Sequence, residues 1–297
     1  VFTANAAPAA LIKYSGDTQI GVVGGVLTNP LTVKTSDQIT NEAVSNIGIN
    51  FQATTPDGAT GHKLEPVSMP TDNLGFARTV FTLGNKQGDY TITANSPDAA
   101  PPAEFKACGR LDVPYYSQLD GRWGDAVYDG AWSVWPWNKI KHQGCALTAA
   151  TMVSNYYTKP RGFQTDPGKL NSDLVANNGY TSSLFHPSGG KIKWDVVACL
   201  SKSMVFDYSS SFNNDIASAY VIRKTIEDRI DNNITVVAMI KGVVARRHFV
   251  VITAKCGDKW IVHNPYTAAE EERPIDTEIF GIRTFIPSAA YPALCAK

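Results

Sequence analysis

The chain has 297 residues, a length typical of two domains of roughly 150 residues each. Lys and Arg together number 27, as do Asp and Glu, so no net charge draws the chain to nucleic acid or to an anionic membrane surface. Apolar residues make up 43% and charged residues 18%, a balance that excludes a disordered chain. No apolar run approaches the roughly 18 residues that span a bilayer. We therefore expect no nucleic-acid partner, no membrane insertion and no coiled coil.

Cysteine and tryptophan divide the chain into two halves. All five cysteines and all six tryptophans follow residue 107. A Pro-rich stretch at 96–102 lies just before them and is typical of a domain boundary. We therefore place one domain at residues 1–107 and a second at 108–297, and we expect thiol chemistry only in the second.

Apolar residues alternate with polar ones in the first half, with the period of two that is typical of strands. The pattern covers residues 31–35, 47–51, 80–83 and 90–94, and clusters of Gly, Asn and Asp separate these segments. No segment of this half keeps a helical period. The first domain is therefore expected to be an all-β, antiparallel sandwich.

Three segments, 27–33, 71–77 and 88–94, resemble in sequence and order the bacterial immunoglobulin-like (Ig-like) repeat of the invasin and intimin type. The resemblance implies an Ig-like sandwich that serves as a stalk at a bacterial surface. The opening Phe-Thr-Ala is similar to residues 105–107, where such a repeat closes, so residues 1–8 are expected to end a preceding repeat. The chain would then be an excised piece of a longer, multi-repeat surface protein. Any other all-β sandwich with an unrelated role is the alternative.

Cys145 has the setting of a reactive thiol, and five cysteines leave one unpaired in an oxidising environment. It precedes a helix-forming run that is expected to end near Tyr157, before Pro160. Backbone N–H groups and the positive end of the helix dipole favour a thiolate at a helix start, as a nucleophile requires. Gly144 is expected to admit substrate closely. On this local pattern alone, a small buried side chain at a helix start is the competing interpretation.

A nucleophilic cysteine needs a base, and His248 is the best candidate. It opens an apolar segment, 248–253, that turns at 256–258 and returns through 259–265 as a predicted hairpin. The start of the first strand then lies beside the end of the second, which brings His248 to Asn264. An amide oxygen that accepts from the imidazole would fix its tautomer and turn the other ring nitrogen to the thiol.

The other histidines of the second half are weaker candidates for the base. His263 neighbours Asn264, and alternation turns it to the opposite face of the sheet. His142 is expected in a loop near the rim of the cleft and His186 in a surface loop. No pair of His or Cys residues has the spacing of zinc ligands, so we expect no metal and no cofactor.

The second half resembles the bacteriocin-processing cysteine peptidases, family 39 of the cysteine peptidases, over residues 111 to about 287. The matching segments, in the order of that family, are 113–118, 122–124, 144–152, 170–171, 178–181, 248–251 and 264–266. The resemblance implies an α+β, papain-like fold in which Cys145 is the nucleophile and His248 the base. It also makes Gln118 a donor of the oxyanion hole, a role for which Gln143 is the rival, beside the backbone N–H of Cys145.

The sequence departs from that family in two places. Asn264 stands where the family usually has Asp, although papain carries Asn there, so this difference tunes the base rather than removing it. The segment before Cys145 is longer than in the transporter-linked members and holds Trp132, Trp135 and Trp137. These tryptophans either grip substrate beside the cleft or pack the loop on the core.

Two further expectations concern the surroundings of the thiol. Arg246 shares the predicted face of the base, where it would lower the pKa of the histidine and attract an acidic substrate; a solvated edge-strand arginine is the alternative. The four other cysteines allow three pairings, of which we favour Cys108 with Cys295 and Cys199 with Cys256.

We therefore expect an extracytoplasmic enzyme, at a bacterial cell surface or in the periplasm, that hydrolyses a peptide or protein substrate. The chemistry would run through a Cys145–His248–Asn264 triad, with Gln118 in the oxyanion hole. Cleavage of peptidoglycan cross-bridges by the same residues is one alternative. An adhesion or assembly module that has lost its activity is the other.

Overall fold

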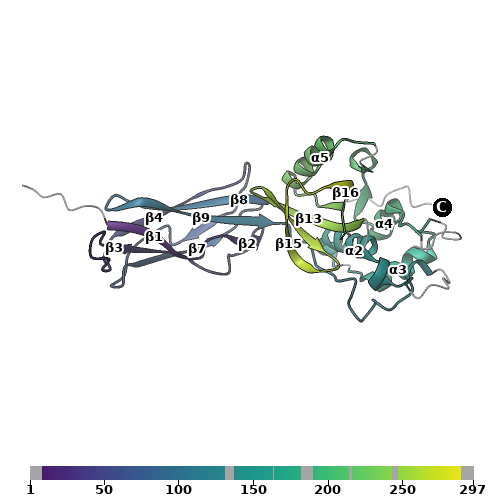
Figure 1. Cartoon of the computed structure of the whole chain (residues 1–297), viewed down its shortest axis with the longest axis horizontal. Coiled ribbons are helices and arrows are strands. Elements are labelled where there is room, and N and C mark those ends of the chain that lie inside the picture. The colour runs from purple at the N-terminus through teal and green to yellow at the C-terminus, as the bar shows by residue number, and fades with distance from the viewer. Residues whose placement is uncertain are drawn as a thin grey trace, which may run out of the picture. The chain divides into compact units, whose positions relative to one another are not determined.

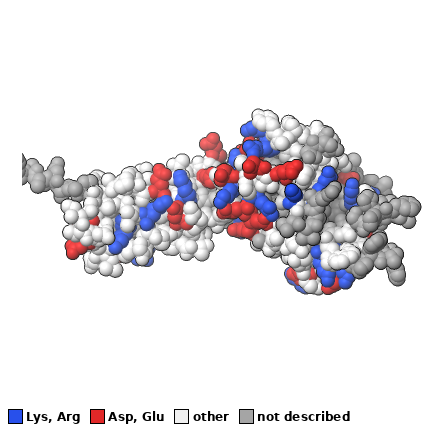
Figure 2. All heavy atoms as spheres, in the orientation of Figure 1, with Lys and Arg blue, Asp and Glu red and all other residues white. Residues whose placement is uncertain are grey.

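The computed structural model describes residues 9–130, 137–162, 164–181, 190–213, 216–242 and 247–288. The predicted end of a preceding repeat, residues 1–8, lies outside this set. Packing divides the chain into two compact units, Val1–Leu111 and Asp112–Lys297. No helix among the described residues is long and apolar enough to cross a membrane. On the face that Figure 2 shows, basic and acidic side chains lie among one another on both units.

The described part of the first unit is built from strands. In chain order they are β1 (Ala9–Ser15), β2 (Gln19–Val22), β3 (Leu31–Ser36), β4 (Gly48–Thr54), β5 (Lys63–Glu65), β6 (Ser68–Pro70), β7 (Phe76–Thr82), β8 (Gly88–Ser96) and β9 (Ala99–Arg110). The segments with alternating apolar residues lie in β3, β4, β7 and β8. The last strand continues beyond residue 107, to Arg110.

These strands form two layers over one core (Figure 1). β5, β7, β3 and β1 are neighbours in one run, and β9, β8, β4 and β6 in the other. A short parallel pairing joins β1 to β9, and β2 also pairs with β9. Both runs contribute side chains to the core, among them Leu11, Leu31, Val33, Ile49, Phe51, Phe81, Tyr90, Ile92 and Phe105. The predicted all-β sandwich is therefore confirmed.

The second unit combines helices with an antiparallel sheet. Its helices are α1 (Ile140–Gln143), α2 (Cys145–Thr158), α3 (Pro167–Ala176), α4 (Trp194–Ser201) and α5 (Ala219–Asp231). Its strands are β10 (Met204–Phe206), β11 (Phe212–Asn213), β12 (Val236–Ile240), β13 (His248–Cys256), β14 (Lys259–Asn264), β15 (Ala268–Pro274) and β16 (Ile279–Pro287). The sheet order is β10-β16-β12-β13-β14-β15, with β11 beside β16. The second unit therefore has the α+β class that the sequence predicts.

Helix α2 packs on this sheet, chiefly against β13 (Figure 1). The helix buries small and apolar side chains, Leu147, Ala149, Ala150, Met152 and Val153, which lets the backbone approach the strands. It ends at Thr158, just before Pro160, close to the predicted end. This packing brings the first residue of α2, Cys145, to the first residues of β13.

Candidate active site

Cys145 is the first residue of α2 and follows Gly144, the cap between α1 and α2. A Cβ on Gly144 would lie 2.4 Å from the carbonyl oxygen of Ile140, whereas the Gly144 N–H donates to that oxygen at 2.6 Å. The absence of a side chain at this position thus serves the joint between two helices. The expectation that Gly144 admits substrate closely stays a prediction, because the close contact seen in the structure is with the chain itself.

Cys145 is the free cysteine of the described residues. Cys108, Cys199 and Cys256 are disulfide-bonded, and Cys295 lies outside the described residues. The expectation that the disulfides spare Cys145 is confirmed, while the pairing of the others stays a prediction. Because its sulfur is not in a disulfide, the Cys145 thiol is free to react as a nucleophile.

His248 and Asn264 meet at the end of the β13–β14 hairpin, as the sequence predicts. His248 opens β13 and Asn264 closes β14, and a bulge between Ile252 and Ala254 adjusts the register between them. The imidazole Nε2–H donates to the Asn264 Oδ1 at 2.7 Å. Asn264 is only 2% exposed, so water competes little for this bond. The other ring nitrogen, Nδ1, is left to exchange a proton with another group.

One cavity of about 100 Å³ brings the four predicted residues together. Gln118, Cys145, His248 and Asn264 all line it. The other lining residues are Lys141, His142, Lys241, Gly242, Tyr266, Thr267 and Arg273. The described lining therefore holds a thiol, two imidazoles and three basic side chains, and no carboxylate is among these described residues.

Gln118 is buried in the wall of this cavity, with 2% of its surface exposed. Its backbone N–H donates to the Pro265 carbonyl at 2.9 Å, and its Nε2 donates one hydrogen to the Lys141 carbonyl at 2.9 Å. An amide nitrogen carries two hydrogens, so one remains for an acceptor in the cavity. The rival, Gln143, donates to the Trp137 carbonyl at 3.4 Å and is not among the described lining residues.

Burial decides the protonation of the two central groups. It raises the pKa of the Cys145 thiol, and the backbone N–H groups of Phe249, Ala146 and Cys145 only partly oppose this rise. Burial also lowers the pKa of His248, against the bond to Asn264 and the charge of Glu271; the charge of Arg273 acts in the same direction as burial. The expectation of a depressed thiol pKa at the helix start is therefore wrong in direction. Both directions favour the neutral thiol and the neutral imidazole at neutral pH.

The sequence-based interpretation missed the groups that lie behind Asn264. The Asn264 Nδ2 donates to the Glu271 Oε2 at 2.7 Å, and the backbone N–H of Tyr266 donates to the Asn264 Oδ1 at 3.0 Å. Arg273 forms an ion pair with Glu271. Alternation along β15 places Glu271 and Arg273 on one face, a signal present in the sequence. A bulge between Val262 and Asn264 shifts the pairing of β14 with β15, so alternation alone does not predict which residue of β14 Glu271 and Arg273 face.

Of the competing histidines, His263 is not among the described residues that line the cavity, as expected, whereas His142 lies near the cavity in helix α1 and not in the predicted loop. His263 is 2% exposed and its ring packs edge-on against Tyr115, with centroids 5.8 Å apart. His142 is exposed at the cavity, and its ring lies 5.0 Å from that of Trp137. Trp137 is 61% exposed. The predictions for His186, Trp132, Trp135 and Arg246 fall outside the described residues.

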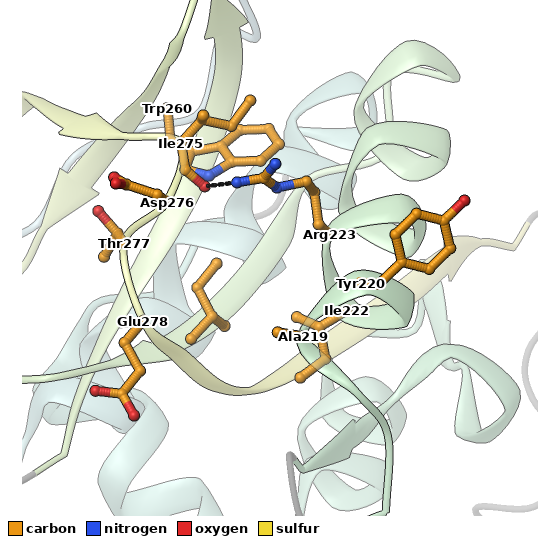
Figure 3. A pocket seen from close by; sticks show the side chains of 10 residues that line it. Ala219, Tyr220, Ile222, Arg223, Trp260, Ile275, Asp276, Thr277 and Glu278 are labelled. Carbon is orange, nitrogen blue, oxygen red and sulfur yellow. Dashed lines mark hydrogen bonds between the residues drawn. The ribbon is translucent and has the colours of Figure 1, made fainter.

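A larger hollow, of about 600 Å³, lies elsewhere in the second unit, between α5 and the turn from β15 to β16 (Figure 3). Ile222 and Ile275 line it with Trp260, and the Arg223 guanidinium donates to the Ile275 carbonyl at 2.9 Å. Its described lining contains no cysteine or histidine. It therefore offers no nucleophile or imidazole base, and the chemistry stays with the cavity at Cys145. The described residues hold no cluster of His, Cys, Asp and Glu suited to a metal ion.

Comparison with solved structures bears on the first unit. The D0-D1 domain of intimin is 22% identical, over 36% of this chain and 48% of that chain, with a TM-score of 0.25. The adhesin InvE of Yersinia pseudotuberculosis is 12% identical, over 54% of this chain and 58% of that chain, with a TM-score of 0.32. The chain thus spans about half of each structure. The N-terminal region resembles the Ig-like domains of these proteins in fold.

Comparison with protein families bears on the second unit. Residues 110–286 match the Peptidase_C39 like family. A comparison with curated proteins found no match. The family match covers the helix that carries Cys145 and the hairpin that carries His248 and Asn264, and it extends over more than half of the chain. The chain belongs to the Peptidase_C39 like family.

Proposed function

We propose that the second unit is an active cysteine peptidase that hydrolyses peptide bonds outside the cytoplasm, carried on the Ig-like unit as a stalk. One observation carries the proposal: His248, held by Asn264 at 2.7 Å, lines the same cavity as the free thiol of Cys145. Family membership supports the peptidase activity. Disulfides and an intimin-like fold support the location, because disulfides persist in oxidising compartments.

The reaction begins from a neutral pair. As the Cys145 sulfur attacks the carbonyl carbon, its proton passes to the His248 Nδ1, and the Nε2–H keeps donating to Asn264. The oxyanion that forms accepts hydrogen bonds from the Gln118 Nε2 and the backbone N–H of Cys145. His248 then returns the proton to the amine that leaves, and a thioester remains on Cys145.

Water completes the cycle. His248 takes a proton from the water that attacks the thioester, and the carboxylic acid product leaves as the sulfur regains its proton. The substrate is a peptide or protein.

The proposal is tested with the full chain and a mixed peptide library analysed by mass spectrometry. Wild-type protein should release new peptide termini, and Cys145→Ala should release none, since no other described cysteine is free. Purified sacculi, incubated in parallel, distinguish a peptidoglycan cross-bridge hydrolase, which would release muropeptides and leave the library intact. A wild-type chain that cleaves neither substrate, and whose Cys145 resists a peptidyl electrophile, would instead be an inactive adhesion or assembly module.

A further inference from the structure

Glu271 lies directly behind the proposed triad, on the strand next to Asn264. Its Oε2 accepts from the Asn264 Nδ2 and from the Thr267 hydroxyl, each at 2.7 Å. Its Oε1 belongs to an ion pair with Arg273. The Glu271 side chain is 23% exposed, and Asn264 in front of it is 2% exposed. The carboxylate is therefore held on both oxygens and faces a buried amide.

This arrangement allows the Asn264 amide only one orientation. The backbone N–H of Tyr266 can only donate, and it points at the Asn264 oxygen at 3.0 Å. The Glu271 carboxylate can only accept, and it lies against the Asn264 nitrogen. A flipped amide would place nitrogen against the N–H of Tyr266 and oxygen against the carboxylate. Two independent contacts thus fix which atom of Asn264 faces His248.

The orientation of the amide decides which ring nitrogen of His248 carries the proton. An oxygen facing Nε2 requires a proton there and leaves the Nδ1 lone pair free. A flipped amide would donate to Nε2 and move the proton to Nδ1, where the imidazole could no longer take a proton from the thiol.

We propose that Glu271 is a positioning residue that, through the Asn264 amide, holds His248 in the tautomer able to accept the Cys145 proton. The inference rests on the proposed role of His248 as base. Arg273 assists by holding Glu271 in place. Glu271 is not among the described residues that line the cavity, so it acts on His248 through the Asn264 amide and, at longer range, through its charge, which Glu271→Gln removes while keeping an acceptor oxygen.

The test uses the full chain labelled with ¹⁵N-histidine, because nitrogen shifts distinguish the two neutral tautomers. Glu271→Met removes the acceptor while filling similar space, and Glu271→Ala is a second acceptor-free variant. Glu271→Gln restores an acceptor oxygen. Glu272→Ala is the matched control, a carboxylate on the same strand that pairs with Lys259 at the surface. A His248→Gln sample assigns the signal.

Wild type and Glu272→Ala should show His248 protonated at Nε2. Glu271→Met and Glu271→Ala should populate the Nδ1–H form beside the Nε2–H form, since the Tyr266 N–H alone then favours the wild-type amide orientation, and Glu271→Gln should recover the wild-type form. The rate constant for alkylation of Cys145 by iodoacetamide at neutral pH should fall by roughly tenfold to a hundredfold in the acceptor-free variants, as expected for losing a hydrogen bond to a charged group. Wild-type tautomer and alkylation rate in both acceptor-free variants would overturn the proposal.

The two proposals fail in different ways. A tautomer that shifts in Glu271→Met, in a chain that cleaves no peptide, supports the positioning role and refutes the peptidase. Peptide cleavage with an unchanged tautomer supports the peptidase and refutes the positioning role. The buried His263 provides an internal signal whose unchanged shift shows that the fold is intact.

Discussion

Replacing Asn264 by Asp, the residue usual in the family that the sequence resembles, is expected to destabilise this protein rather than strengthen its base. The Asn264 Nδ2 lies 2.7 Å from the Glu271 Oε2, so the new carboxylate would face an existing one. Two such charges relaxed to about 4 Å repel by about 4 kcal/mol at an effective dielectric constant of about 20. That energy equals a rise of about 3 in the pKa of one carboxyl. Because Arg273 offsets part of it, we expect the free energy of unfolding at pH 7 to fall by about 2–4 kcal/mol.

Urea denaturation between pH 4 and 8 measures this effect. A carboxyl whose pKa is raised by folding costs stability only above its unfolded pKa, so the deficit should grow from about pH 4 to about pH 7. Adding Glu271→Gln to Asn264→Asp leaves one carboxylate and should recover stability, with a coupling energy of at least about 1 kcal/mol. A deficit absent at every pH, or simple additivity of the two changes, would show that these side chains do not face each other.

Three further predictions concern the residues around the thiol. Gln118→Ala should lower kcat/KM by about 100- to 1,000-fold through loss of an oxyanion donor, yet leave alkylation of Cys145 by iodoacetamide within about twofold; an equal loss in both assays would contradict the oxyanion role. Gly144→Ala should lower the free energy of unfolding in urea by about 1–3 kcal/mol, because its Cβ would meet the Ile140 carbonyl at 2.4 Å; wild-type stability would contradict that close contact. Burial lowers the pKa of His248 below its ordinary 6.5, so as the pH falls the unfolded chain takes up a proton at His248 before the folded chain does. The free energy of unfolding should therefore fall as the pH drops through 6.5. In His248→Gln the free energy of unfolding, measured by urea denaturation, should depend less on pH near 6.5. An unchanged dependence would contradict the lowered pKa of His248.

Local sequence patterns were enough to predict several strands of the first unit and, in the second unit, the helix and the hairpin that carry Cys145, His248 and Asn264. Alternation marked strands β3, β4, β7 and β8, because side chains on half-buried strands repeat with period two. The run of small and apolar residues after Cys145, followed by Pro160, gave the limits of α2 closely. The hairpin turn at 256–258 brought His248 to Asn264, since a turn fixes which residues of two strands pair.

What local patterns could not supply depends on the packing of distant segments. The pKa of Cys145 is set mainly by burial, to which many segments contribute, and this outweighs the local N–H groups that favour a thiolate. The close contact at Gly144 arises from the short helix α1, which is too short for a periodic spacing of apolar residues to predict it. Glu271 stands in a run of charged residues, and a bulge in β14 decides that it faces Asn264.

The most direct test of the central claim is active-site titration with a peptidyl electrophile at neutral pH, followed by intact-mass and peptide-mass analysis. If Cys145 is the nucleophile and His248 its base, wild-type protein should gain one adduct per chain, on Cys145. His248→Ala should gain it at least about 100-fold more slowly, the lower bound for loss of a general base. Modification at the same rate in His248→Ala, or no adduct on Cys145 in wild type, would contradict the account.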